Sequence, residues 1–179
     1  MAASVRALGG ARWRAGRTGD RRHPHQSSSV RQWSKKGEAS QAVGRSRGGR
    51  TSKIHALADA DGRPIAFTLT PGNIADITIA PELLDTVPPP CRLLADKAYD
   101  ADAFRAWLKD RDIEAVIPSS AARKKPYPYD RHAYTRRNVI ERMFCRLKDW
   151  RRIATRYDRL ARNFLSALAL VATACFWAI

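Results

Sequence analysis

Short apolar segments of strand length alternate with helix-length segments between residues 51 and 117, and this alternation limits the fold more than any other feature of the sequence. Two strand-like runs, 53–58 and 64–70, flank Asp59-Ala-Asp-Gly62, which is typical of an antiparallel hairpin. A helix (78–87), a strand (92–96), a helix (102–109) and a strand (113–117) are predicted to follow. This order predicts an α/β domain with a mixed sheet and helices packed on it.

Basic residues are concentrated at both ends of the chain. Lys and Arg number 33 against 17 Asp and Glu, a net charge of +16. Residues 1–50 carry 12 basic and 2 acidic side chains and residues 121–179 carry 14 and 4, whereas residues 51–120 carry 7 and 11. The excess points to a polyanionic partner, nucleic acid first. The acidic middle is either a cation-holding carboxylate centre between phosphate-binding flanks or a solvated surface of mixed sign.

The two ends differ in character. Residues 1–40 are rich in arginine and poor in branched aliphatic residues, so we expect a disordered or aberrant basic segment ahead of one folded domain at 41–179. Residues 164–179 are apolar and uncharged, but a membrane span usually needs about 20 residues. A buried core helix is favoured there, and the alternative is the anchor of a membrane-associated basic protein. The three cysteines, distant from one another and odd in number, exclude a disulfide scaffold and a four-cysteine zinc site.

Two carboxylates are candidates for chemistry. Asp96 ends the predicted strand 92–96, where sites in α/β sheets lie, although a residue of this kind often serves a turn or caps a helix. Glu141 lies in a long helical region, where by itself it would be an exposed glutamate paired with Arg137 one turn earlier. Cleavage of phosphodiesters by two metal ions requires carboxylates that converge on hard cations.

A polar stripe runs along this helical region. At 100° per residue, Tyr134, Arg137, Glu141 and Lys148 fall within a stripe about 60° wide. The apolar residues lie roughly opposite, at Val139, Ile140, Met143, Leu147 and Trp150. One face is therefore predicted to pack on the domain while the other presents Tyr, Arg, Glu and Lys in a row.

The spacing Tyr134-x2-Arg137-x3-Glu141-x6-Lys148 resembles the Y-x2-R-x3-E-x6-K signature of bacterial insertion-sequence transposases with a DDE active site, the IS four/IS five-like group. Further segments that resemble this family are Gly44-Arg-Ser-Arg-Gly-Gly49, Lys53-Ile-His-Ala56, Leu94-Ala-Asp-Lys-Ala-Tyr-Asp100, Arg146-Leu-Lys-Asp-Trp-Arg-Arg152 and Thr155-Arg-Tyr-Asp158. The resemblance extends from about residue 41 to residue 179.

The resemblance implies a ribonuclease-H-like fold, incomplete at its N-terminus, and an Asp-Asp-Glu triad that binds Mg2+, for which Mn2+ may substitute. It implies DNA strand cleavage and transfer at transposon ends. Asp96 matches the second Asp and Glu141 the Glu, both as catalytic residues and metal ligands. Tyr134, Arg137 and Lys148 match positions that contact DNA near the cleaved phosphate. The implied partners are transposon-end and target DNA and a second copy on that DNA, in the bacterial cytoplasm and nucleoid, without a membrane.

Three departures from the family pattern change the expectation. The first Asp of the triad should stand seven residues before His25, where Thr18 is found, and the nearest acid is Asp20. Asp59 and Asp61 are expected to serve the hairpin turn instead. Ala98 stands where the family often has Gly, and the helical N-terminal region of relatives is missing. We therefore expect a transposase fragment with an impaired centre, and the alternative is a catalytically dead DNA-binding remnant.

Overall fold

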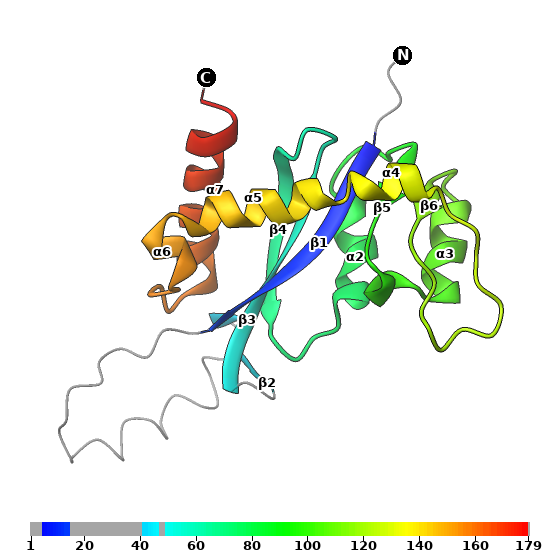
Figure 1. Cartoon of the computed structure of the whole chain (residues 1–179). Coiled ribbons are helices and arrows are strands. Elements are labelled where there is room, and N and C mark those ends of the chain that lie inside the picture. Colours follow the sequence, from blue (N-terminus) through cyan, green and yellow to red (C-terminus); the bar gives the residue numbers. More distant parts are fainter. Residues whose placement is uncertain (1–4, 15–40, 47–48, 179) are drawn as a thin grey trace.

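The computed structural model describes residues 5–14, 41–46 and 49–178, and these form a mixed six-stranded sheet with helices on both faces (Figure 1). The strand order is β2-β3-β1-β5-β6, and β4 also pairs with β3. Strands β1 and β5, and β5 and β6, run parallel, whereas β3 is antiparallel to β1, β2 and β4. The strands are β1 Val5–Arg14, β2 Gly44–Ser46, β3 Gly49–Ala58, β4 Pro64–Pro71, β5 Arg92–Leu94 and β6 Glu114–Val116. The predicted α/β class and mixed sheet are confirmed.

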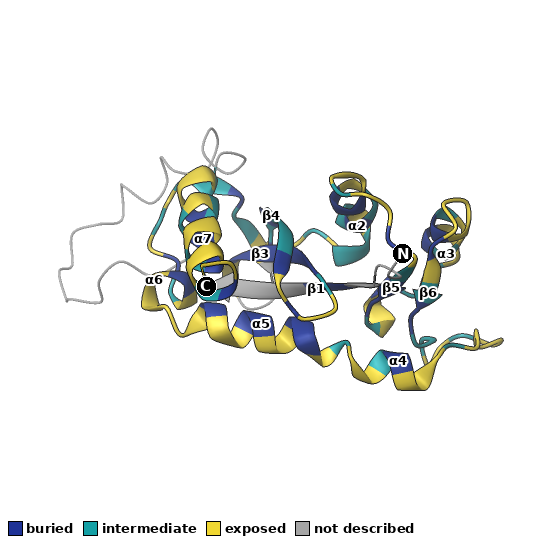
Figure 2. Ribbon diagram, turned by 90° about the horizontal axis from the view of Figure 1, so that it is seen from above, coloured by how far each residue is buried: buried dark blue, intermediate teal, exposed yellow. Residues whose placement is uncertain are grey.

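The helices cover the sheet in two layers. Figure 2 shows α2 and α3 on one side of the strands and α4 and α5 on the other. Side chains alternate accordingly along β3: Ile54 and Ala56 pack toward α5, whereas Leu57 packs toward α2 and α3. The helices are α2 Asp76–Asp85, the 3-10 helix η1 Lys97–Tyr99, α3 Asp102–Lys109, α4 Arg131–Thr135, α5 Asn138–Lys148, α6 Arg151–Ala154 and α7 Ala161–Phe176.

Most of these elements were predicted from local sequence signals. The hairpin forms as predicted, and Asp59 closes its turn by accepting hydrogen bonds from the backbone N–H groups of Asp61 and Arg63, at 3.0 and 2.8 Å. Gly62 has φ +80°, which favours glycine. Helix α3 has the predicted bounds. The capping hydroxyl of Thr78 made it the expected N-cap of the helix 78–87. Helix α2 instead starts at Asp76, two residues earlier than predicted, so Thr78 lies inside the helix.

Strand β1 lies within the segment 1–40 that was expected to be disordered or aberrant. It pairs with β3 on one side and β5 on the other, so neighbouring strands satisfy its backbone. Small residues allow this position, because a Cβ on Gly9 would lie 2.9 Å from Cγ1 of Ile140 in α5. The division of the chain at residue 40 stays a prediction, but part of the N-terminal segment belongs to the sheet. Asp20 and His25 lie outside the described residues.

Helix α7 buries only one face, contrary to the expected core helix. Its buried side chains recur every four residues, at Phe164, Leu168, Ala172 and Phe176, and pack with α5 and the sheet. Leu170, on another face, is 72% exposed. The absence of charge in this segment therefore did not mean burial on all sides. Among the described residues, none of the helices has the length and apolar character needed to cross a bilayer.

This one-sided packing predicts a clear contrast between two leucines of α7. Leu168 is 0% exposed, and Leu168→Ala is expected to lower the free energy of unfolding by about 2–5 kcal/mol through lost burial and the remaining cavity. Leu170→Ala removes the same atoms from an exposed position and is expected to cost about 0.5 kcal/mol or less. Urea unfolding followed by circular dichroism measures both. Equal losses in the two variants would contradict the packing described.

Candidate active site

Asp96 lies directly beyond β5, at the carboxyl end of a parallel strand. Its Oδ1 accepts the backbone N–H of Ala98 at 2.8 Å and so caps η1. This bond fixes the carboxylate and leaves Oδ2 available to another group. Ala98 is not among the positive-φ residues, so the substitution of the family's Gly causes no strain at this turn.

Arg137 joins Asp96 to Glu141. Its Nη2 lies 3.3 Å from Asp96 Oδ2, and its Nη1 lies 2.6 Å from Glu141 Oε1. Two carboxylates that are distant in the sequence therefore meet on one guanidinium, and the Arg137 side chain is only 20% exposed. Its Nε is buried and has no partner among the described residues, which leaves one donor of the guanidinium unused.

The signature residues follow one edge of the α4–α5 rod, which crosses the sheet almost without interruption (Figure 1). Residues 136 and 137 form the link, and Arg137 keeps right-handed helical angles of φ −55° and ψ −24°. Tyr134 is half-buried in α4, and its ring meets that of Tyr129 edge to face at 5.6 Å. Lys148 ends α5, exposed, roughly 10 Å along the helix from Glu141.

The charges of Arg137 and Asp96 also act on the hydroxyl of Tyr134. Burial raises the pKa of Tyr134, Arg137 lowers it, and the carboxylate of Asp96 raises it, with a net increase. The phenol is therefore a protonated hydroxyl near neutral pH and can donate a hydrogen bond to an anion. The predicted stripe is thus brought together around the two carboxylates, except that Lys148 lies two turns away along the helix.

The donor set fits a hard divalent cation only in part. Mg2+ is commonly held by one or two carboxylates together with substrate phosphates, and Asp96 and Glu141 provide two converging carboxylates. No cluster of three or more His, Cys, Asp or Glu side chains suited to a metal occurs in the described part of the chain. Strand β1, which pairs with β5 beside Asp96, contains no Asp or Glu. A third carboxylate from this strand is therefore missing.

A buried polar cluster behind Asp96 was not predicted from the sequence. The buried Lys53 donates to Asp76 Oδ1 at 2.8 Å and to the Ile74 carbonyl at 2.6 Å. Two residues further along β3, His55 exchanges a hydrogen bond with Thr70 Oγ1 at 2.8 Å. Burial lowers the pKa of His55 and outweighs the opposing effect of Asp76, so the ring is neutral near pH 7. Alternation along β3 was the available signal, because it places positions 53 and 55 on one face.

Tyr99 connects this cluster with Asp96. Its side chain is fully buried, and its hydroxyl has no hydrogen-bond partner among the described residues. Burial raises the pKa of Tyr99, and the nearby carboxylates of Asp76 and Asp96 raise it further. Tyr99 is therefore influenced by both carboxylates, of which Asp76 is paired with Lys53 at the start of α2.

Comparison with known protein families identifies the family of the chain. A family model described as "Transposase DDE domain" matches residues 10–176. The chain belongs to the DDE transposase family. The mixed sheet with flanking helices is accordingly that of the ribonuclease-H-like fold, and DDE transposases typically use divalent metal ions.

Three relatives of this DDE transposase are named as transposases of insertion sequences. A protein of Brucella ovis, for element IS6501, is 35% identical over 128 residues, which cover 71% of this chain and 98% of the relative. A protein of Burkholderia cepacia, for IS402, is 34% identical over 73% of this chain and 64% of its own length. The IS1106 transposase of Neisseria meningitidis serogroup B is 30% identical over 51% of this chain and 34% of its own length.

Proposed function

We propose that this DDE transposase acts on the DNA ends of an insertion sequence, with Asp96 and Glu141 as the carboxylates of a Mg2+-dependent site for strand cleavage and transfer. The observation that carries the proposal is the convergence of the two carboxylates on Arg137, at 3.3 and 2.6 Å. Oxygen donors of this kind suit Mg2+, and Mn2+ can replace it. The family match and the names of the relatives support DNA as the substrate.

Each residue has a separate role in the proposed mechanism. The Ala98 N–H orients the Asp96 carboxylate, and Glu141 approaches it from α5. A divalent ion bound there would activate the attacking oxygen and stabilise the leaving one. The guanidinium of Arg137, which already contacts both carboxylates, would bind a phosphate oxygen, and the protonated Tyr134 would donate to the same group. Lys148 would hold a phosphate farther along the strand.

A second candidate function is DNA binding without cleavage. It is favoured by one observation, because β1 carries no acidic residue next to Asp96 in the described part of the chain. A site with two carboxylates would bind metal weakly and cleave slowly. In either form we place the protein on DNA in the nucleoid of the bacterial cytoplasm. We also propose that it acts as a homodimer, since a transposable element has two ends.

Nicking of end DNA tests the proposal. The wild type is incubated with a labelled duplex that carries the end of its own element, with Mg2+ or Mn2+ in parallel. We expect metal-dependent nicking that falls to background in Asp96→Asn. The matched control is Asp149→Asn, which removes an exposed carboxylate beyond the end of α5 and should leave nicking unchanged.

The outcomes separate the two candidates. Salt-sensitive DNA binding without nicking by the wild type, in either metal, would establish the DNA-binding function and reject cleavage. Equal nicking by the wild type and Asp96→Asn would reject the assigned site. Absence of DNA binding would reject both candidates.

A further inference from the structure

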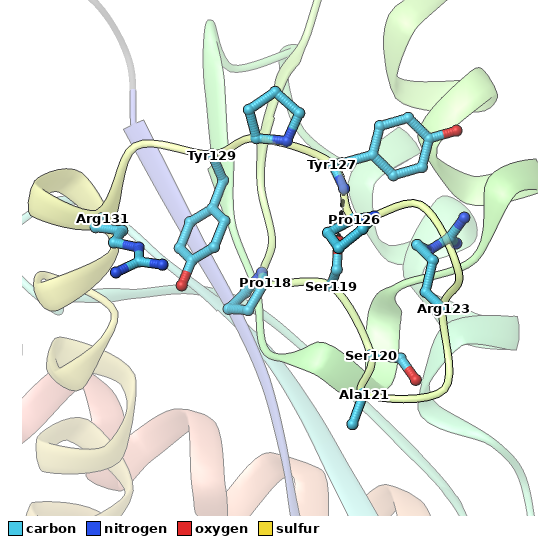
Figure 3. Close-up of a pocket in the computed structure, with 10 residues that line it drawn as sticks. Pro118, Ser119, Ser120, Ala121, Arg123, Pro126, Tyr127, Tyr129 and Arg131 are labelled. Atoms are coloured by element: carbon cyan, nitrogen blue, oxygen red, sulfur yellow. Dashed lines mark hydrogen bonds between the residues drawn. The ribbon is translucent and has the colours of Figure 1, made fainter.

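A preformed pocket lies in the loop between β6 and α4, outside the carboxylate pair. Its volume is about 550 Å3, which is within the range of small-molecule sites. Figure 3 shows Tyr129 and Arg131 on one side of it and Ser119, Ser120 and Arg123 on the other. The loop contributes serine hydroxyls, two guanidiniums and two aromatic rings to one open cavity.

A buried carboxylate holds the loop in place. The Asp100 side chain is 0% exposed and accepts from the Ser120 N–H at 2.7 Å and from Arg123 Nε at 2.9 Å. Burial raises the pKa of Asp100, but these bonds, with one from Arg105, outweigh burial and lower it from 3.8 to about 2. The anchor is therefore ionised at neutral pH. Because the loop is already held in place, binding of a ligand would not carry the entropy cost of ordering it.

The charge of the loop is available for a ligand. Lys124, Lys125 and Arg131 are exposed, and none has an acidic partner among the residues that the structure describes. By contrast, the charge of Arg123 is balanced by Asp100 and Asp102, at 2.9 and 2.6 Å. Arg131 lines the cavity, and Lys124 and Lys125 lie in the same loop between two of its lining residues, Arg123 and Pro126. Three cations without counter-charges in one loop favour an anionic ligand with several charges.

Tyr129 connects the pocket to the signature residues. Its ring lines the cavity and meets the ring of Tyr134 edge to face. Tyr134 in turn lies near Arg137 and Asp96, whose charges act on its hydroxyl. The pocket is thus next to the edge along which the proposed DNA contacts run. An aromatic face beside phosphate-binding cations is the combination that binds single-stranded nucleic acid, whose bases are free to stack.

We propose that the pocket of residues 118–131 binds a single-stranded segment of the DNA substrate, with one base against Tyr129 and phosphates on Lys124, Lys125 and Arg131. The inference rests on the proposed function, because it concerns the same DNA. It adds a binding site for unpaired DNA beside the carboxylates. A protein that binds only duplex DNA would not need such a site.

Binding of fluorescent oligonucleotides to the full chain tests the aromatic contact. Anisotropy is measured with a single strand and with a duplex of the same length, without divalent metal. Tyr129→Leu keeps an apolar side chain but removes the ring, and it is expected to weaken single-strand binding by roughly 5- to 150-fold with duplex binding nearly unchanged. Tyr129→Phe retains the ring and should bind the single strand like the wild type.

Salt dependence tests the phosphate contacts. Lys124→Ala with Lys125→Ala should reduce the slope of log affinity against log salt for the single strand by about 0.7 for each lost contact. The matched control, Lys109→Ala with Arg162→Ala, removes the same charge from exposed positions on α3 and α7 and should leave the slope unchanged.

The results separate this inference from the proposed function. Equal weakening of single-strand and duplex binding by Tyr129→Leu, or equal slopes in the two double variants, would overturn the pocket site. Neither result would change the conclusion drawn from the nicking assay. A selective loss of single-strand binding would support the pocket even if the wild type does not nick DNA. A wild type that binds duplex but no single strand would also overturn it.

Discussion

Replacing Arg156 with methionine is expected to lower the free energy of unfolding by roughly 3–5 kcal/mol. The residue is only 3% exposed, although it carries a charge. Its guanidinium donates to Ser52 Oγ in β3 and to the Gln41 carbonyl, and its remaining donors bind two carbonyls of the α6–α7 connection. Methionine would fill much of the space but leave these acceptors without a donor in a buried position.

The expected loss depends on the shape of the guanidinium as well as on its charge. Arg156→Lys should recover little, because one ammonium group cannot reach four acceptors that lie around a planar fork. Arg162→Met, at an exposed position of α7, is the matched control and should change stability by about 0.5 kcal/mol or less. Chemical unfolding of the three variants measures the differences. If Arg156→Met lowers the free energy of unfolding by less than about 1 kcal/mol, Arg156 does not stabilise the packing of the C-terminal helices against β3.

Local signals were sufficient for the hairpin and for α3, because turn residues and apolar periodicity act over a few positions. They were insufficient for β1, whose composition is poor in branched residues and whose backbone is satisfied by β3 and β5. The start of α2 was also misplaced, since Thr78 offers a capping hydroxyl. The helix instead begins at Asp76, which Lys53 holds from a distant strand. Tertiary contacts therefore decided where sequence propensity was weak or ambiguous.

The candidate site, like the fold, could be predicted only in part from the sequence. The order of Tyr134, Arg137 and Glu141 along one helix edge could be predicted, because helical geometry fixes it. The position of Asp96 at the end of a strand was also readable. The pairing of Arg137 with Glu141 one turn later was predicted and is found. The contact of Arg137 with Asp96 was not predicted, since it depends on how α5 crosses β5. The cluster around Asp76 was missed for a similar reason, as its members come from β3, β4 and α2.

Removing either carboxylate of the pair is expected to weaken Mn2+ binding by about 100-fold or more. Loss of outer groups around a metal typically costs 10- to 100-fold in affinity, and a lost ligand should cost at least as much. The variants are Asp96→Asn and Glu141→Gln, which keep the shape of each side chain. Bound Mn2+ is measured by electron paramagnetic resonance on the full chain, once without DNA and once with end DNA. Unchanged binding in both variants would show that the ion lies elsewhere.

Arg137→Ala is expected to strengthen Mn2+ binding when DNA is absent. The guanidinium now compensates the two carboxylates at 3.3 and 2.6 Å, so a divalent ion must compete with it. Without that positive charge, the carboxylates repel each other and attract a cation more strongly. With DNA present the gain should disappear, because Arg137 is then also the proposed phosphate ligand. Opposite effects of neighbouring substitutions cannot arise from general unfolding, which would weaken binding in all three variants.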